Sequence, residues 1–256
     1  MVVGFIPKAA GFGYAIIVFF LLAYLWYSGR ITRRGAVIFL IISTALGFLI
    51  FAPVAPWQFQ LLVLGDVKGL GIGVQIAAFG LLFFLGFALL FGRIFCGHIC
   101  PAGAVQELVY LAPLKKTGRT WKKATMAIRL VVFILLMVLA VVFSINLLRI
   151  LGLRDFFYLA IGSVSFFIYF GIVILSAVLY RPFCRFICPY GLLLSISATW
   201  SLFKFRRTDK CIHCKKCERI CPTDESKEGD RKSECYMCGR CVEVCPVEGA
   251  LRYGRG

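Results

Sequence analysis

The stretch GRIFCGHICPAGAVQELV (residues 92–109) follows a long apolar run and contains the pattern Cys-x-x-x-Cys-Pro. The stretch RPFCRFICPYGLLLSIS (residues 181–197) repeats this pattern, again directly after an apolar run. The cysteines concerned are Cys96, Cys100, Cys184 and Cys188. Since two apolar runs separate the copies, the repeat predicts an internal duplication of parallel sense. The apolar spacing after each proline also predicts a helix lying along the membrane surface.

The composition indicates a membrane protein. Apolar residues make up 61% of the 256 residues and charged residues only 16%, against about 45–50% and about 25% in soluble domains. A membrane-spanning helix needs about 20 apolar residues. Runs of that length cover 10–28, 36–56, 71–92, 125–147 and 158–180. We therefore expect a polytopic α-helical membrane protein with about five transmembrane helices.

The charge distribution predicts how the chain is oriented. Residues 1–204 hold 17 Lys and Arg against three acids, and basic loops alternate with nearly neutral ones. The positive-inside rule places the N-terminus outside and the C-terminus in the cytoplasm, as a multi-pass protein of the cell membrane. We expect a lipid bilayer rather than nucleic acid as the partner of these charges. Docking of a soluble ferredoxin and binding of anionic lipid both remain open for the inner basic side chains. These are Lys115, Lys116, Lys122, Lys123, Arg206 and Arg207.

The composition changes near residue 205, which divides the chain into a membrane domain (1–204) and a tail domain (205–256). The tail contains CIHCKKCERICP and CYMCGRCVEVCP, two copies of the run C-x2-C-x2-C-x3-C-P. This run is typical of bacterial two-cluster ferredoxins, in which the fourth cysteine serves the other cluster. We expect a small α+β domain that metal ligation folds, because so short a segment buries little core. The predicted ligands are Cys211, Cys214, Cys217 and Cys245 for one [4Fe–4S] cluster, and Cys235, Cys238, Cys241 and Cys221 for the second.

Three interpretations remain open for the cysteines of the two Cys-x-x-x-Cys-Pro motifs. They hold a third [4Fe–4S] cluster, which we favour, or act as redox-active dithiols, or are structural thiols. Arg93 and Arg181 each precede a pair and are placed to offset thiolate charge. The histidines are His98 and His213 alone, and the chain has no C-x-x-C-H motif, so we expect no haem. His98 is either a donor to a sulfur or an interfacial polar residue, and His213 lies in a cluster loop without being a ligand.

Together, the two motifs and the two-cluster tail resemble the NapH-type membrane ferredoxins over roughly residues 36–250. Related membrane cores occur in the nitrous-oxide reductase regulator and in a cytochrome-oxidase assembly ferredoxin. NapH-type proteins usually have four spans, whereas five apolar runs are found here, and the regulator's flavin-bearing domain has no counterpart.

The resemblance implies single-electron transfer between a cytoplasmic partner and the quinone pool or a membrane redox partner. We expect an electron-transfer subunit rather than an enzyme with catalytic residues of its own. The alternatives are an assembly factor that reduces a metal or thiol for a partner enzyme, and a fixed subunit of a larger redox complex.

Overall fold

The structure is a computed structural model that describes residues 2–70, 73–117 and 122–255. Its elements are α1 (Val2–Tyr27), α2 (Arg33–Ile50), α3 (Ala55–Val63), α4 (Val67–Leu70), α5 (Val74–Phe91), η1 (Phe95–Ile99), α6 (Pro101–Tyr110), α7 (Lys122–Phe143), α8 (Leu147–Ile150), α9 (Leu153–Phe157), α10 (Val164–Leu175), η2 (Phe183–Ile187), α11 (Pro189–Thr199), β1 (Phe203–Arg207), α12 (Lys216–Ile220), α13 (Arg240–Glu243) and β2 (Leu251–Arg255).

Three helices are long and apolar enough to cross a membrane, in α1, α5 and α7. The second apolar run forms a bent pair, because α2 and α3 meet at 45° across a short break. Phe51 ends α2 in the left-handed conformation, with φ of 50°. Pro53 and Pro56 follow, and proline does not continue a preceding helix. Among the described residues, the bundle therefore has three spans, or four if the bent pair counts as one.

The fifth apolar run differs from the full-length span expected for it. Residues 158–163 form turns, and helix α10 begins only at Val164 and has 12 residues. The Ser163 hydroxyl donates to the Asp155 carboxylate at 2.8 Å, which holds this turn in place. The chain is thus polytopic and helical, as predicted, but the described residues contain three candidate spans, or up to four, rather than the five expected.

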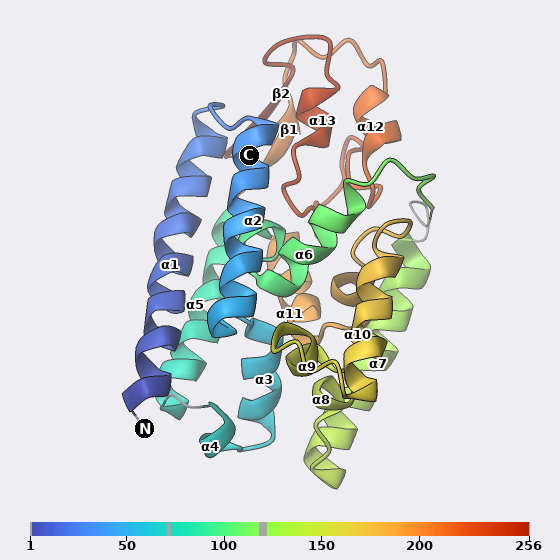
Figure 1. Cartoon of the computed structure of the whole chain (residues 1–256). Coiled ribbons are helices and arrows are strands. Elements are labelled where there is room, and N and C mark those ends of the chain that lie inside the picture. The colour runs from blue at the N-terminus through green and yellow to red at the C-terminus, as the bar shows by residue number, and fades with distance from the viewer. Residues whose placement is uncertain (1, 71–72, 118–121, 256) are drawn as a thin grey trace.

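Helices α6 and α11, which follow the two cysteine motifs, lie inside the bundle (Figure 1). Most residues of both helices are buried. Helix α6 packs against α2, and α11 packs against α5 and α3. Other helices therefore cover both of them, while their expected position at the level of the membrane surface stays a prediction.

The tail lies at the end of the bundle away from the N-terminus (Figure 1). Strands β1 and β2 pair antiparallel, with Phe205 opposite Tyr253. The Tyr253 hydroxyl donates to the Phe91 carbonyl at the end of α5, at 2.8 Å. The Phe205 ring packs edge-on against Trp26 of α1, with centroids 5.1 Å apart. The tail thus sits directly on the membrane helices. The middle of the predicted basic loop, residues 118–121, lies outside the described residues, as do residues 71–72 at the start of the third apolar run.

Candidate functional site

Each Cys-x-x-x-Cys-Pro motif folds into a π-helical turn followed by an α-helix. The amide of the second cysteine donates to a phenylalanine carbonyl at 2.9 Å in both copies, from Cys100 to Phe95 and from Cys188 to Phe183. A residue before proline favours extended backbone, and proline is well suited to start a helix. Accordingly, ψ is 120° at Cys100 and 115° at Cys188, and each cysteine caps the next helix. The two motifs therefore share one local structure.

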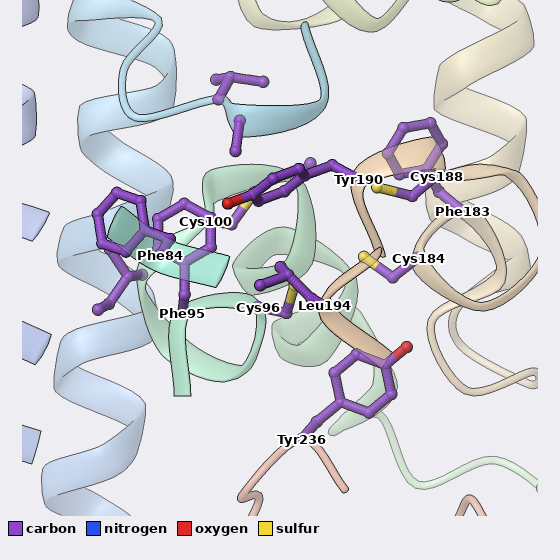
Figure 2. Close-up of a cluster of buried hydrophobic side chains, with 14 of the residues drawn as sticks. Phe84, Phe95, Cys96, Cys100, Phe183, Cys184, Cys188, Tyr190, Leu194 and Tyr236 are labelled. Carbon is purple, nitrogen blue, oxygen red and sulfur yellow. The ribbon is translucent and has the colours of Figure 1, made fainter. Parts of the chain in front are cut away.

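The two turns bring their four cysteines together in the interior. Figure 2 shows the sulfur atoms of Cys96, Cys100, Cys184 and Cys188 facing a common space. Each residue is at most 6% exposed. We call this group the membrane cysteine set.

Two buried glutamates lie beside the membrane cysteine set, and each is shared by two arginines. Glu234 of the tail accepts from Arg93 at 3.0 Å and from Arg129 of α7 at 2.6 Å. Glu107 of α6 accepts from Arg181 at 2.9 Å and from Arg240 of the tail at 2.5 Å.

Both carboxylates remain ionised in spite of their burial. Burial raises the pKa of each carboxyl, but the paired arginines lower it by more than burial raises it. The resulting pKa is about 2 for both Glu234 and Glu107. Four arginines against two glutamates leave a surplus of two positive charges in the interior. Buried charge is costly unless it is compensated. The surplus therefore fits a negatively charged group held by the membrane cysteine set.

Unpaired polar atoms also point to a bound group. The Tyr169 side chain is buried, and its ring packs against Phe183, which directly precedes Cys184. The Tyr169 hydroxyl has no hydrogen-bond partner among the described residues, and neither do two guanidinium nitrogens of Arg93. Buried donors are nearly always paired. An iron–sulfur cluster at the membrane cysteine set fits these donors, since its sulfurs accept hydrogen bonds.

The tail cysteines line two separate cavities. One is lined by Cys221, Cys235, Cys238 and Cys241, together with Tyr236 and Arg240. The other is lined by Cys211, Cys214, Cys217 and Cys245. Each cavity thus combines three cysteines of one run with the last cysteine of the other run.

No group of three or more His, Cys, Asp or Glu side chains in the described residues is arranged to hold a single metal ion. A cubane separates its ligand sulfurs more widely than a single ion does, because each sulfur binds a different iron. The lack of a single-ion site therefore says nothing against clusters, for which the four cysteines of each tail cavity are the candidate ligands.

Tyr236 lies where the tail meets the membrane cysteine set (Figure 2). It directly follows Cys235, and the guanidinium groups of Arg93 and Arg181 lie over its ring, 4.2 Å and 4.9 Å from the centroid. Its backbone carbonyl lies so close to Gly97 that a Cβ at that glycine would overlap it. Arg181 in turn donates to the carbonyls of Cys96 and Gly97. One loop of the tail thus contacts both cysteine motifs of the membrane part.

The sequence prediction missed several residues of this site, namely Glu107, Arg129, Tyr169, Glu234 and Tyr236. Two of them carried a signal. Arg129 is a charge within an apolar run, and such a residue usually faces a partner inside the bundle. Glu107 is one of three acids in residues 1–204 and follows a cysteine motif.

The two histidines differ in their surroundings. His98 is 2% exposed, and its Nδ1 has no partner among the described residues. Its backbone carbonyl accepts from the Ser43 hydroxyl at 2.7 Å. His213 is exposed and lies 3.8 Å from a Glu228 carboxylate oxygen; its neighbours Ile212 and Cys214 line a tail cavity, whereas His213 is not among the lining residues.

Several of the basic residues expected to dock a partner are engaged within the chain. Lys116 donates to three backbone carbonyls, of Tyr110, Ala112 and Ala177. Lys122 pairs with Glu225 and Asp230 of the tail, and Arg207 pairs with Glu218 at 2.5 Å. These side chains therefore hold the tail and the loops in place.

Comparison with known proteins identifies the class. A family described as a 4Fe-4S binding domain matches residues 74–120 and again 161–208, so that each match contains one Cys-x-x-x-Cys-Pro motif. A 4Fe-4S dicluster domain matches residues 203–246. No solved structure matches the chain. This is an iron–sulfur protein of the membrane whose cysteine motifs are duplicated, as the sequence predicted.

The relatives narrow the class to a family. An uncharacterized protein of Methanocaldococcus jannaschii is 33% identical, with the match covering 64% of this chain and 66% of the relative. The putative electron transport protein YccM of Escherichia coli is 28% identical over 55% of this chain and 44% of the relative. The regulatory protein NosR of Pseudomonas aeruginosa is 28% identical over 52% of this chain and 21% of its own length. The chain thus spans less than two thirds of the length of these curated relatives. Taken together, the two 4Fe-4S matches and these relatives show that the chain belongs to the NapH-type membrane ferredoxin family.

Proposed function

We propose that this protein passes single electrons between a partner at the tail and the interior of the membrane. The observation that carries the proposal is the contact between the Cys235–Tyr236 loop of the tail and Gly97, which directly follows Cys96. Electron transfer slows steeply as the distance between redox groups grows. Here the residue next to a tail cluster ligand, Tyr236, packs against the residue next to Cys96, which gives such a short path.

We assign three [4Fe–4S] clusters to the chain. The grouping of the tail cysteines around the two cavities supports one cluster at Cys211, Cys214, Cys217 and Cys245, and another at Cys235, Cys238, Cys241 and Cys221. The inward-facing sulfurs and the surplus positive charge support a third at the membrane cysteine set. This assignment keeps the division at residue 205, with one cluster in the membrane part and two in the tail.

The side chains around the clusters compensate charge and hold the tail on the bundle. When bound, the clusters supply one-electron redox chemistry. The arginines compensate the charge of the thiolates, which lets four cysteines bind as anions in a buried place. Glu107 and Glu234 fix the arginines and also tie the tail to the bundle. Glu107 of the bundle pairs with Arg240 of the tail, and Glu234 of the tail pairs with Arg93 and Arg129 of the bundle.

We propose that the tail faces the cytoplasm of a cell with this protein in its inner membrane. The basic loops at the tail end of the bundle support this orientation under the positive-inside rule. The electron partner at the tail is then a soluble redox protein such as a ferredoxin. The partner on the membrane side is a redox subunit or a quinone.

The test is the iron and acid-labile sulfide content of anaerobically purified protein, with EPR of the reduced sample. We expect about twelve irons per chain, and about eight in Cys184→Ser with the tail signals intact. Cys241→Ser is the matched variant, and it should lose a tail signal instead. If the unchanged chain held about eight irons, or if Cys184→Ser retained about twelve, the membrane cluster would be refuted.

A further inference from the structure

A second functional feature lies at the end of the bundle opposite the tail, where α3, α4 and α8 gather (Figure 1). A hollow opens there between the segments 51–70 and 144–149, Arg154 of α9 and Tyr158, which directly follows α9. Its charged lining residues are Lys68, Arg149, Arg154 and Asp66. Three cations against one acid give this hollow a net positive charge. We call it the distal pocket.

The acid of the distal pocket is already used by the fold. The Asp66 carboxylate accepts from the backbone amide of Gly69 at 2.9 Å, which closes the turn into α4. The guanidinium of Arg154 lies over the Tyr158 ring, 5.3 Å from its centroid. No ion pair of the described residues joins Asp66 to a cation of the pocket. The cations therefore remain directed to a ligand or to solvent.

Aromatic rings form one wall of the distal pocket, from Phe51, Trp57 and Tyr158. The Phe51 centroid lies 5.7 Å from that of Trp57 and 5.4 Å from that of Tyr158. Such a wall suits a planar ring, which stacks on aromatic faces. Cations beside it suit an anionic group.

A row of packed rings connects this wall to the membrane cysteine set. From Phe51 it continues to Phe157, with centroids 5.9 Å apart, and on to Tyr169 at 6.4 Å. Tyr169 then meets Phe183 at 5.4 Å, and Phe183 directly precedes Cys184. Figure 2 shows the Phe183 ring near Cys188. The row thus forms a continuous aromatic path between the pocket wall and the cysteines.

We propose that the distal pocket binds a small, planar, anionic electron carrier, which exchanges electrons with the membrane cysteine set along the aromatic row. This proposal rests on the proposed function, because it needs a cluster at that set. Each transfer removes one electron from a reduced cluster and adds one to the carrier. Two transfers, with two protons from the aqueous opening of the pocket, reduce a quinoid ring to the hydroquinone. The chain thereby conducts electrons from the tail end of the bundle to its opposite end.

The test uses anthraquinone-2,6-disulfonate, a planar redox-active dianion, added to cluster-loaded protein in nanodiscs of neutral lipid. Binding is measured as quenching of tryptophan fluorescence, with Trp57→Phe to show that the signal comes from the pocket. Methyl viologen, a planar dication, is the control ligand. Arg149→Gln/Arg154→Gln is the test variant, and Arg252→Gln, which removes an exposed cation of the tail, is the control variant.

We expect the double variant to weaken binding of the disulfonate by at least about tenfold, since charge-assisted contacts are lost. Arg252→Gln and the viologen should show no such effect. Equal affinity in both variants, or equal binding of the viologen, would overturn the proposal. Displacement of the disulfonate by nanodiscs of anionic phosphatidylglycerol would also overturn it, because the pocket would then be a lipid headgroup site.

The redox step has a separate readout. In wild-type protein, the disulfonate should oxidise the reduced membrane cluster and so remove its EPR signal. At equal ligand concentration, the double variant should lose much less of this signal. A chain with about eight irons that still binds the disulfonate in the pocket would refute the membrane cluster and leave the binding site standing. A chain with about twelve irons and no pocket binding would refute the distal pocket alone.

Discussion

Replacing Glu234 by glutamine tests how the tail is held on the bundle. Glu234 is a tail residue, and its carboxylate accepts from Arg93 and Arg129, whose side chains are at most 1% exposed. Glutamine keeps the size but removes the charge, so both guanidinium groups lose their counter-charge in the interior. Breaking a buried ion pair in this way costs about 3–5 kcal/mol.

The lower end of that range applies here. Arg93 keeps its contact with the Tyr236 ring at 4.2 Å, and Arg129 keeps the carbonyls of Cys184 and Arg185. A loss of about 3 kcal/mol raises the population of chains with an undocked tail roughly 100-fold. The undocked state exposes backbone amides of residues 233–237, so their hydrogen exchange should accelerate by about that factor if exchange occurs through undocking.

The assay is amide hydrogen exchange followed by mass spectrometry on anaerobically purified protein. Glu248→Gln is the matched control, because it makes the same chemical change at an exposed position of the tail. Exchange within about twofold of that control in Glu234→Gln would refute the reasoning. It would mean that the buried ion pairs contribute little to tail docking.

Two further predictions concern the contacts of the membrane cysteine set. Gly97→Ala should loosen the contact between the tail and the membrane part and accelerate hydrogen exchange of Tyr236, because the new Cβ would overlap the Tyr236 carbonyl. The control is Gly86→Ala, whose Cβ would meet nothing within 4 Å. Equal exchange in both variants would contradict the close approach of Tyr236 to Gly97. Tyr169→Phe should leave the iron content unchanged but lower the reduction potential of the membrane cluster in an EPR-monitored titration, because a hydrogen bond to cluster sulfur favours the reduced form. Exposed Tyr24 provides the control variant, Tyr24→Phe, and an unchanged potential in Tyr169→Phe would show that its hydroxyl does not reach the cluster.

The sequence by itself determined the class of protein, because the signals concerned are local. Membrane-spanning length, cysteine spacing and the proline after each motif act over a few residues or one helix. The duplication could be read in the same way, and the two copies indeed share one π-turn and one helix start. The fifth apolar run shows the limit of such signals. The hydropathy of this run indicates a span, but it does not predict the turn that Ser163 and Asp155 stabilise.

Only the tertiary structure decided which charges surround the cysteines and how the tail attaches. Arg240 meets Glu107 across 133 residues of sequence, and Arg93 meets Glu234 across 141. No periodicity connects positions so far apart, since their contact depends on how all the helices pack. The burial of α6 and α11 within the bundle depends on the same packing, because an amphipathic pattern shows that one face is apolar but not what covers the other. The distal pocket and its aromatic row likewise combine residues from separate helices, and they exist only once the bundle has formed.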